Sequence, residues 1–252
     1  MAEKYYGWGL PIDISTNGFQ IDRLIWVVHI FMAVLFAGWF LFLVYAILKF
    51  RQKSGRQAHY HTQHFKLPTY LEIGVAVTEV LLLCAFSFPI FYHVRKEFPQ
   101  KDKAIELRIV AEQFAWNIHY PGQDRVFGKT DLERINSENP LGLDPSDPHG
   151  ADDVITLNQL HIPVDMPVIA TLSSKDVIHS FSLPVMRVKQ DVIPGQAIPI
   201  WFEAKKEGNF EIACAQLCGL GHYRMRGFFI SESKEKFAAW LEEQKPQAKG
   251  AA

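Results

Sequence analysis

The chain has 252 residues, a formal net charge of −1 and a hydrophobic fraction of 48%. The near-neutral charge gives no support to nucleic-acid binding, and three cysteines are too few for a disulfide-stapled scaffold. A chain of this length forms one sizeable domain or two smaller ones.

Two strongly apolar runs lie in the first 98 residues. Residues 24–48 contain no formal charge, and residues 73–94 contain a single acid. Each run is longer than the about 20 residues that a helix needs to cross a bilayer, and the first starts too far from Met1 for a cleaved signal peptide. The sequence therefore predicts an N-terminal segment and a helical hairpin in the lipid bilayer, within residues 1–98.

The segment between the two runs predicts the orientation of the hairpin. Residues 49–70 carry five basic side chains and no acid, a pattern typical of loops that stay in the cytoplasm. We therefore expect the N-terminus and the chain beyond the second run to lie on the side of the membrane opposite the cytoplasm, which in a bacterial inner membrane is the periplasm.

Two acids accompany the second run, Glu72 just before it and Glu79 within it. Seven residues are about two helical turns, so the two side chains share one helix face. An acid inside the membrane is costly and indicates a functional role by default. A carboxylate at the level of the lipid headgroups is the simpler interpretation of Glu72, and the residues alone leave both interpretations open.

From residue 99 onward the pattern changes to short β-rich runs separated by Pro and Gly, which is typical of an antiparallel sandwich or barrel. Examples are residues 105–111, 167–174 and 226–231. Residues 123–153 read as a long, acid-rich loop, and residues 233–244 as an amphipathic closing helix with Ser233 at its N-cap. Residues 99–252 are therefore predicted to form an all-β domain with a C-terminal helix.

The stretch CAQLCGLGHYRM, residues 214–225, gathers soft metal donors. Thiolate, imidazole and thioether together suit copper, and His179 is a candidate further ligand from an earlier strand. Two thiolates bridging two coppers would use both Cys214 and Cys218, whereas a mononuclear blue-copper site would leave one of them without a role. A disulfide and a structural zinc site are alternatives that the residues leave open.

Together with the two predicted membrane helices, these motifs resemble subunit II of the haem–copper cytochrome c oxidases. The resemblance covers nearly the whole chain and rests on SSKDVIHSFSLP, VKQDVIPG and CAQLCGLGHYRMRG, in the family's order and spacing. It implies a cupredoxin-like Greek-key fold and a dinuclear copper centre, called CuA. The implied ligands are the side chains of His179, Cys214, Cys218, His222 and Met225 and the backbone carbonyl of Gln216. Glu72 matches the acid at the mouth of the family's K proton pathway, and Glu79 stays unassigned.

Departures from the family pattern affect the expected partners. Gln216 stands where relatives have a glutamate that binds Mg²⁺ or Mn²⁺ at the subunit I interface, so that second metal site lacks its carboxylate. Phe114 occupies the position of the exposed tryptophan through which relatives accept electrons, and Trp116 matches the second tryptophan of that motif. Lys175 replaces an acid that is common in the docking patch. We therefore expect a donor other than a soluble mitochondrial-type cytochrome c, such as a membrane-bound c-type haem or one in a supercomplex with alternative complex III.

The resemblance implies the electron-accepting subunit of a proton-translocating oxidase, bound to subunit I and the other oxidase subunits. Electrons from a c-type cytochrome would pass through the copper centre to haem in subunit I, where O₂ is reduced to water. Residues 99–252 carry 21 acids and 17 bases, a formal charge of −4 that would attract a basic donor. The chain contains no C-x-x-C-H, so we expect no fused cytochrome c domain of the caa3 type. The competing hypotheses are a CuA-containing subunit of a nitric oxide reductase and a membrane-tethered copper carrier.

Overall fold

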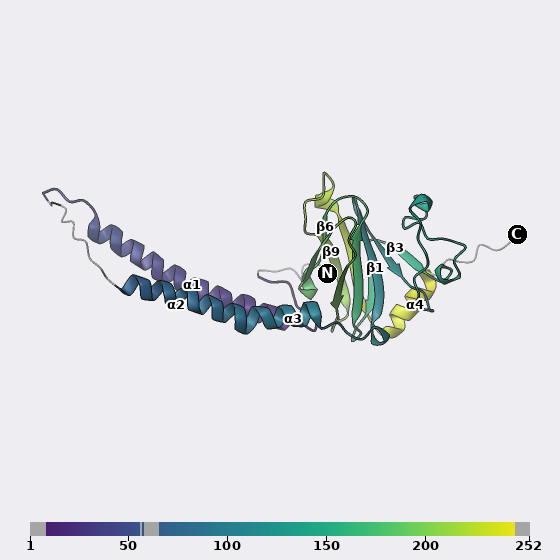
Figure 1. Cartoon of the computed structure of the whole chain (residues 1–252), viewed down its shortest axis with the longest axis horizontal. Coiled ribbons are helices and arrows are strands. Elements are labelled where there is room, and N and C mark those ends of the chain that lie inside the picture. The colour runs from purple at the N-terminus through teal and green to yellow at the C-terminus, as the bar shows by residue number, and fades with distance from the viewer. Residues whose placement is uncertain (1–8, 56, 58–65, 245–252) are drawn as a thin grey trace. The chain divides into compact units, whose positions relative to one another are not determined.

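The computed structural model describes residues 9–55, 57 and 66–244. The chain divides into two compact units, one comprising Gln20–His93 and the other comprising Met1–Phe19 with Val94–Ala252. The first unit is helical, whereas the second is built mainly from β-strands (Figure 1).

The two apolar runs form long helical segments. The first is α1, and the second consists of α2, a π-helical turn and α3. Their bounds are Gly18–Phe50 for α1, Leu67–Leu82 for α2, Leu83–Ser87 for the π turn and Phe88–Lys96 for α3. Within the described residues, these two segments of 33 and 30 residues are long and apolar enough to cross a membrane.

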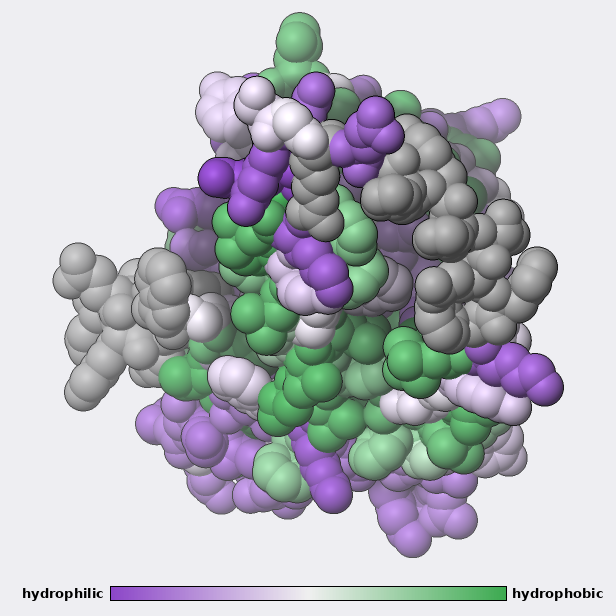
Figure 2. Space-filling model, turned by 90° about the vertical axis from the view of Figure 1, so that its left-hand side faces the viewer, coloured by the Kyte–Doolittle hydropathy of each residue, from purple (hydrophilic) through white to green (hydrophobic). Residues whose placement is uncertain are grey.

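Large apolar side chains remain exposed along both helices. Phe36 and Trp39 on α1 are 71% and 68% exposed, and Leu81 on α2 is 60% exposed. Hydrophobic residues form the green surface at the centre of Figure 2. Because so much apolar surface is unfavourable in water, lipid or partner helices must cover it, and the expected pair of apolar helices is confirmed. The expected cytoplasmic position of residues 49–70 stays a prediction, and residues 56 and 58–65 of that loop lie outside the described residues.

The strands of the described β unit form two five-stranded sheets. The first has the order β3-β2-β1-β5-β8, and its strands are β1 (Ile105–Glu112), β2 (Ala115–Tyr120), β3 (Val154–Leu157), β5 (Val168–Ser174) and β8 (Ile198–Phe202). The second has the order β4-β10-β9-β6-β7, and its strands are β4 (Gln159–Pro163), β6 (His179–Leu183), β7 (Val188–Val192), β9 (Gly208–Cys214) and β10 (Arg226–Glu232). Buried side chains from both sheets form one continuous apolar core, so the unit is a β-sandwich.

Each sheet contains one parallel strand pair, β1 with β5 and β4 with β10. The sequence predicts an antiparallel sandwich or barrel, and the sandwich departs from that prediction only at these two pairs among the described strands. Leu107, Ile109 and Ala111 of β1 are buried alternately with their neighbours. This period-two pattern shows which face of a strand is buried, but it is the same for parallel and antiparallel neighbours.

The predicted closing helix is present as α4 (Lys234–Gln244). Its Trp240 ring stacks on His161 of β4 with 3.8 Å between ring centroids, and it meets the Tyr120 ring edge-on at 5.4 Å. The Tyr120 hydroxyl donates to the carbonyl of His161 and accepts from its backbone N–H. These contacts fix α4 against β2 and β4.

A buried contact between a histidine and a carboxylate anchors the acid-rich loop that joins β2 to β3. One oxygen of Asp153, Oδ2, lies 2.6 Å from Nε2 of His119 and accepts a hydrogen bond of 2.8 Å from the backbone N–H of Gly128. The side chains of Asp153 and His119 are 0% and 1% exposed. The start and the end of this loop are therefore tied together against β2.

The residues that precede α1 pack on the β-sandwich. Ile14 is buried, and its backbone N–H donates to the carbonyl of Val185. The guanidinium group of Arg187 donates to the carbonyls of Pro11 and Pro184. The segment before α1 is thus part of the β unit.

Candidate metal centre

The donor-rich stretch lies at one end of the second sheet. His179 begins β6 and Cys214 ends β9, and these strands are antiparallel neighbours with Cys214 paired to Phe181. A loop follows Cys214 and ends in a 3-10 turn, His222–Arg224. The backbone N–H of Cys214 donates to the carbonyl of Met225, which closes the loop at its base. We call residues 214–225 the ligand loop.

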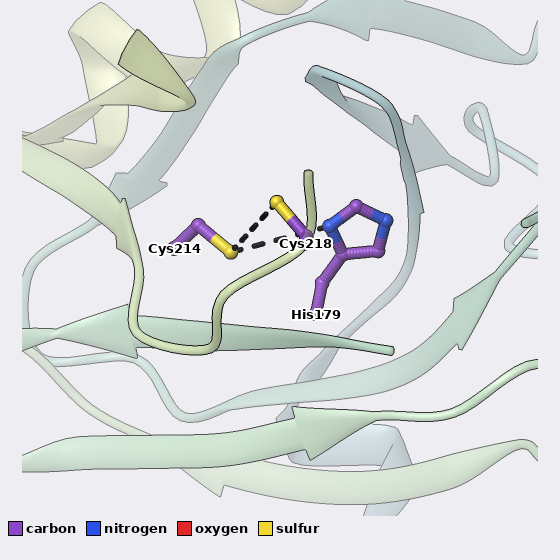
Figure 3. A group of neighbouring side chains, drawn as sticks. All are labelled: His179, Cys214 and Cys218. Carbon is purple, nitrogen blue, oxygen red and sulfur yellow. Dashed lines mark hydrogen bonds between the residues drawn. The ribbon is translucent and has the colours of Figure 1, made fainter. Parts of the chain in front are cut away.

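The two thiols lie at the centre of the donor cluster. Their Sγ atoms are 3.7 Å apart. Figure 3 shows the Cys218 sulfur pointing toward that of Cys214, and the Cys214 sulfur pointing toward the His179 ring. Nδ1 of His179 lies 4.0 Å from Sγ of Cys214, whereas Nδ1 of His222 lies 3.7 Å from Sγ of Cys218. Each thiol therefore has an imidazole neighbour of its own.

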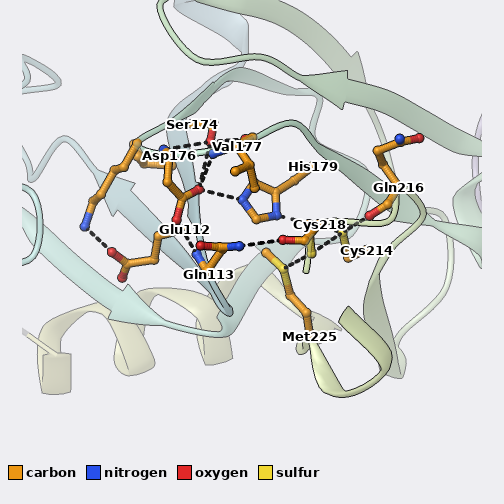
Figure 4. Close-up of polar contacts among 12 residues, drawn as sticks. Glu112, Gln113, Ser174, Asp176, Val177, His179, Cys214, Gln216, Cys218 and Met225 are labelled. Carbon is orange, nitrogen blue, oxygen red and sulfur yellow. Dashed lines mark hydrogen bonds and ion pairs between the residues drawn. The ribbon is translucent and has the colours of Figure 1, made fainter. Parts of the chain in front are cut away.

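Two weaker donors complete the cluster. Sδ of Met225 lies 3.6 Å from Sγ of Cys218, and the carbonyl oxygen of Gln216 lies 3.2 Å from Sγ of Cys214 (Figure 4). The Gln216 side chain is exposed. The structure thus brings together all six donor groups that the sequence singled out.

The geometry bears on the alternatives to a copper pair. A disulfide needs sulfur atoms about 2.05 Å apart, and both cysteines are free thiols here. A single tetrahedral zinc, bound at about 2.0–2.3 Å, would draw its four donors to within about 4 Å of one another. The group of donor atoms that all lie within 4.8 Å of one another comprises His179, Cys214 and Cys218, without His222. Two thiols with one imidazole each suit two ions better than one.

The electrostatics of the thiol pair favour a bound cation. Cys218 is 4% exposed, and burial, with the neighbouring Cys214 thiol adding to it, raises the pKa of the Cys218 thiol to about 11. Two thiolates at this separation are unfavourable without a compensating positive charge. Metal cations between them would supply that charge, so the residues present fit a thiolate-bound metal group.

Asp176 fixes the orientation of the His179 ring. Its Oδ1 lies 2.9 Å from Nε2 of His179, and its Oδ2 accepts a 2.7 Å hydrogen bond from the backbone N–H of Gln113. Burial raises the pKa of Asp176, but the hydrogen bonds from His179, Gln113 and Val177 outweigh it and hold that pKa below its ordinary value. An ionised Asp176 accepts a hydrogen bond from the N–H group at Nε2. The lone pair of Nδ1 is then free to face the thiols.

The structure places the two aromatic candidates differently. Trp116 is fully buried, with its ring edge-on to Phe181 and to His179 at 5.5 and 6.2 Å between centroids. Phe114 is partly exposed, and its ring lies against Gly221 so closely that a Cβ there would be 2.3 Å from a ring carbon. Phe114 can therefore contact a partner at the surface, whereas Trp116 lies beneath His179.

The sequence did not single out several residues at this end of the sandwich. Leu217, Leu220 and Tyr223 of the ligand loop are 76%, 97% and 86% exposed. These side chains offer apolar contact area at the surface beside the donor cluster. Gln113 and Asp176 were also missed, although the position of Asp176 three residues before His179 could have indicated a partner for the imidazole.

Glu72 lies on α2, which belongs to the helical unit, and its side chain is exposed there. Its role in proton uptake stays a prediction. Glu79 is exposed on the same helix.

The fold and the donor cluster define a β-sandwich with a candidate soft-metal site, joined to two helices long and apolar enough to cross a membrane. A family described as "Cytochrome C oxidase subunit II, periplasmic domain" matches residues 107–230. The chain is 37% identical to alternative cytochrome c oxidase subunit 2 of Bradyrhizobium diazoefficiens over 239 residues, which cover 94% of this chain and 84% of that protein. The chain belongs to the cytochrome c oxidase subunit II family.

Two further similarities were found. Cytochrome c oxidase subunit 2 of Cereibacter sphaeroides is 27% identical over 252 residues, covering 94% of this chain and 80% of that protein. The crystal structure of the periplasmic domain of subunit II of cytochrome oxidase of Bradyrhizobium japonicum is similar with a TM-score of 0.43 and 28% identity, over 59% of this chain and 97% of that one. The expected architecture of two apolar helices, a cupredoxin-like β-sandwich and a C-terminal helix is confirmed by the strand order and helices described above.

Proposed function

We propose that the chain holds two copper ions in a CuA centre and relays electrons from a c-type cytochrome to haem in subunit I of a cytochrome c oxidase. The observation that carries the proposal is the arrangement of the two thiols. They lie 3.7 Å apart, and each has its own imidazole neighbour. Neither a disulfide nor a single zinc ion accounts for this arrangement.

Each donor would have a distinct part. Cys214 and Cys218 would bridge the two ions, and His179 and His222 would each bind one of them. Met225 and the Gln216 carbonyl are suited to weak outer coordination, since a thioether and a neutral carbonyl are poorer ligands than a thiolate. Held by these residues, copper would supply one-electron redox chemistry.

The protein around the donors favours electron relay. His179, Cys218 and Met225 are 0%, 4% and 2% exposed, so water has little access to these three donors, whereas Cys214 and His222 are half-buried. The burial of three donors also argues against a copper carrier, since a carrier must release its metal to a partner through exposed ligands. The fixed His179 ring and the closed ligand loop keep donor positions constant, which lowers the structural rearrangement that electron transfer requires.

The exposed ligand loop is a suitable docking surface. Leu217, Leu220 and Tyr223 offer apolar contact area directly beside the donors. The mild acidic excess of residues 99–252 would draw in a basic cytochrome, with a rate that falls as salt rises. The ammonium group of Lys175 is 2.6 Å from Glu112. This pairing neutralises one acid on the surface around Lys175, so the surface attracts a soluble basic cytochrome less strongly. A donor held nearby, for example on the membrane or in a supercomplex with alternative complex III, would not need that attraction.

The helices would anchor the chain in the inner membrane beside subunit I, with both termini in the periplasm. Glu72 would then take up protons for the K pathway, because a carboxylate at the end of a membrane helix can exchange protons with water. The exposed Gln216 amide provides an oxygen but no charge, so any Mg²⁺ or Mn²⁺ near it would need its charged ligands from a partner subunit.

The function is tested in the assembled oxidase by stopped-flow mixing with a reduced c-type cytochrome. Cytochrome oxidation should precede reduction of haem in subunit I. The variant His222→Ala should abolish rapid cytochrome oxidation while leaving the haem content unchanged. Rapid oxidation by that variant at the unmodified rate would contradict the proposal.

A further inference from the structure

The two-residue turn between β1 and β2 contacts both segments that supply ligands. This turn consists of Gln113 and Phe114. It faces the loop before His179 on one side and the ligand loop on the other (Figure 4). These segments are far apart in the sequence, so a contact to both can fix their relative positions.

The Gln113 side chain holds the ligand loop. Its Nε2 donates a 2.7 Å hydrogen bond to the carbonyl oxygen of Cys218. A Cβ added at Gly219 would lie 2.7 Å from the same Nε2 atom, so the loop backbone lies directly against the amide. The glycine permits this close approach, and its φ of +130° is one that other residues rarely adopt.

The Gln113 backbone holds the other ligand segment. Its N–H donates to Oδ2 of Asp176 at 2.7 Å, while Oδ1 of the same carboxylate lies 2.9 Å from Nε2 of His179. One residue thus reaches His179 through Asp176 and reaches Cys218 directly.

We propose that Gln113 is a positioning residue that fixes Cys218 relative to His179 and so prepares the donors before metal binds. The effect on copper rests on the proposed function. The hydrogen bond from Gln113 to Cys218 does not, because it is present in the metal-free chain. Groups that orient metal ligands in this way affect metal affinity about 10–100-fold when they are removed.

The test uses the full-length chain in detergent micelles with two variants of Gln113. Gln113→Leu removes the amide. Gln113→Glu keeps its size and polarity but replaces the NH₂ donor with an oxygen that cannot donate when ionised. Gln123→Leu is the matched control, because the Gln123 amide also donates a hydrogen bond, to Glu242, away from the donor cluster.

Two readouts are compared. In the copper-loaded chain, both Gln113 variants should release copper to a chelator about tenfold faster and shift the visible sulfur-to-copper absorption. In the metal-free chain, iodoacetamide should modify Cys218 roughly fivefold faster, because one hydrogen bond fewer holds the loop closed. Cys84, which lies on the π turn of the helical unit, serves as an internal reference because its alkylation rate should be the same in all variants.

The outcomes separate this inference from the proposed function. If the unmodified chain fails to bind copper, the proposed function fails, and Cys218 alkylation still decides the role of Gln113. If copper binds but both variants match the unmodified chain in absorption and alkylation, the positioning role is overturned while the function stands. A Gln113→Glu variant that behaves like the unmodified chain would also overturn it. The size of the side chain, and not the hydrogen bond that its amide donates, would then be enough to position Cys218. Loss of the β-sheet circular dichroism signal in both variants would overturn it as well, because Gln113 would then serve the fold as a whole.

Discussion

Gly221→Ala should displace the ligand loop, since the residue directly precedes His222. Gly221 has φ −90° and ψ 6°, a conformation that is allowed for alanine, so the main effect of the substitution is steric. The added Cβ would lie 2.3 Å from Cδ2 of Phe114 and 2.6 Å from two further ring carbons. Ordinary carbon contacts are about 3.5–4.0 Å, so the loop or the ring must move by about 1 Å.

A displacement of this size exceeds what a metal site tolerates, because ligand distances are held to about ±0.2 Å. We therefore expect Gly221→Ala to lose at least one of two copper ions, and to be destabilised by about 1–3 kcal/mol as an overpacked site. Copper per chain after gel filtration with a chelator measures the first effect, and a thermal melt of the metal-free chain measures the second.

A double variant tests whether Phe114 is the cause. Phe114→Leu makes room for the new methyl group, so Gly221→Ala combined with Phe114→Leu should regain copper relative to Gly221→Ala alone. Gly74→Ala is the control, since a Cβ there meets no atom within 4 Å. The steric argument would be refuted if Gly221→Ala kept both copper ions and the unmodified melting temperature.

Three further predictions follow from individual contacts. Cys218→Ser should abolish thiolate-bound copper. Cys84→Ser should leave the copper content unchanged, because Cys84 lies on the π turn of the helical unit. Equal copper loss in both variants would contradict the assignment of Cys218 as a ligand. Asp153→Ala leaves the buried His119 ring and the backbone N–H of Gly128 without their acceptor. Thermal melts should therefore show a destabilisation of about 3 kcal/mol, and an unchanged melting temperature would refute this prediction. The contact with Asp124 raises the pKa of His149 above 6.5, so its stabilisation is present below pH 6.5 and is lost as pH rises through the raised value; an NMR titration of His149 with a midpoint at or below 6.5 would contradict this.

The donor cluster was predictable because most of it is contiguous in the sequence. Cys214, Cys218, His222 and Met225 recur at spacings of four and three residues, and soft donors at such density indicate a metal. The membrane helices were predictable for a similar reason, since length and hydropathy are local properties. His179 needed the motif around it, because nothing in its spacing alone relates it to Cys214.

The contacts that hold the donors could not be predicted in this way. Gln113 lies 105 residues before Cys218, and their hydrogen bond depends on the path of a two-residue turn. The complete burial of Trp116 depends on how the two sheets pack. The parallel pairing of β1 with β5 depends on the order of strands in the sheet, which period-two burial does not specify.

The central claim is that two coppers share the thiols of Cys214 and Cys218. Electron paramagnetic resonance on the copper-loaded full-length chain tests it most directly. An unpaired electron shared equally by two copper nuclei gives a seven-line hyperfine pattern, and metal analysis should find two copper ions per chain. A four-line spectrum with one copper ion per chain would contradict the account, because the electron would then reside on a single ion.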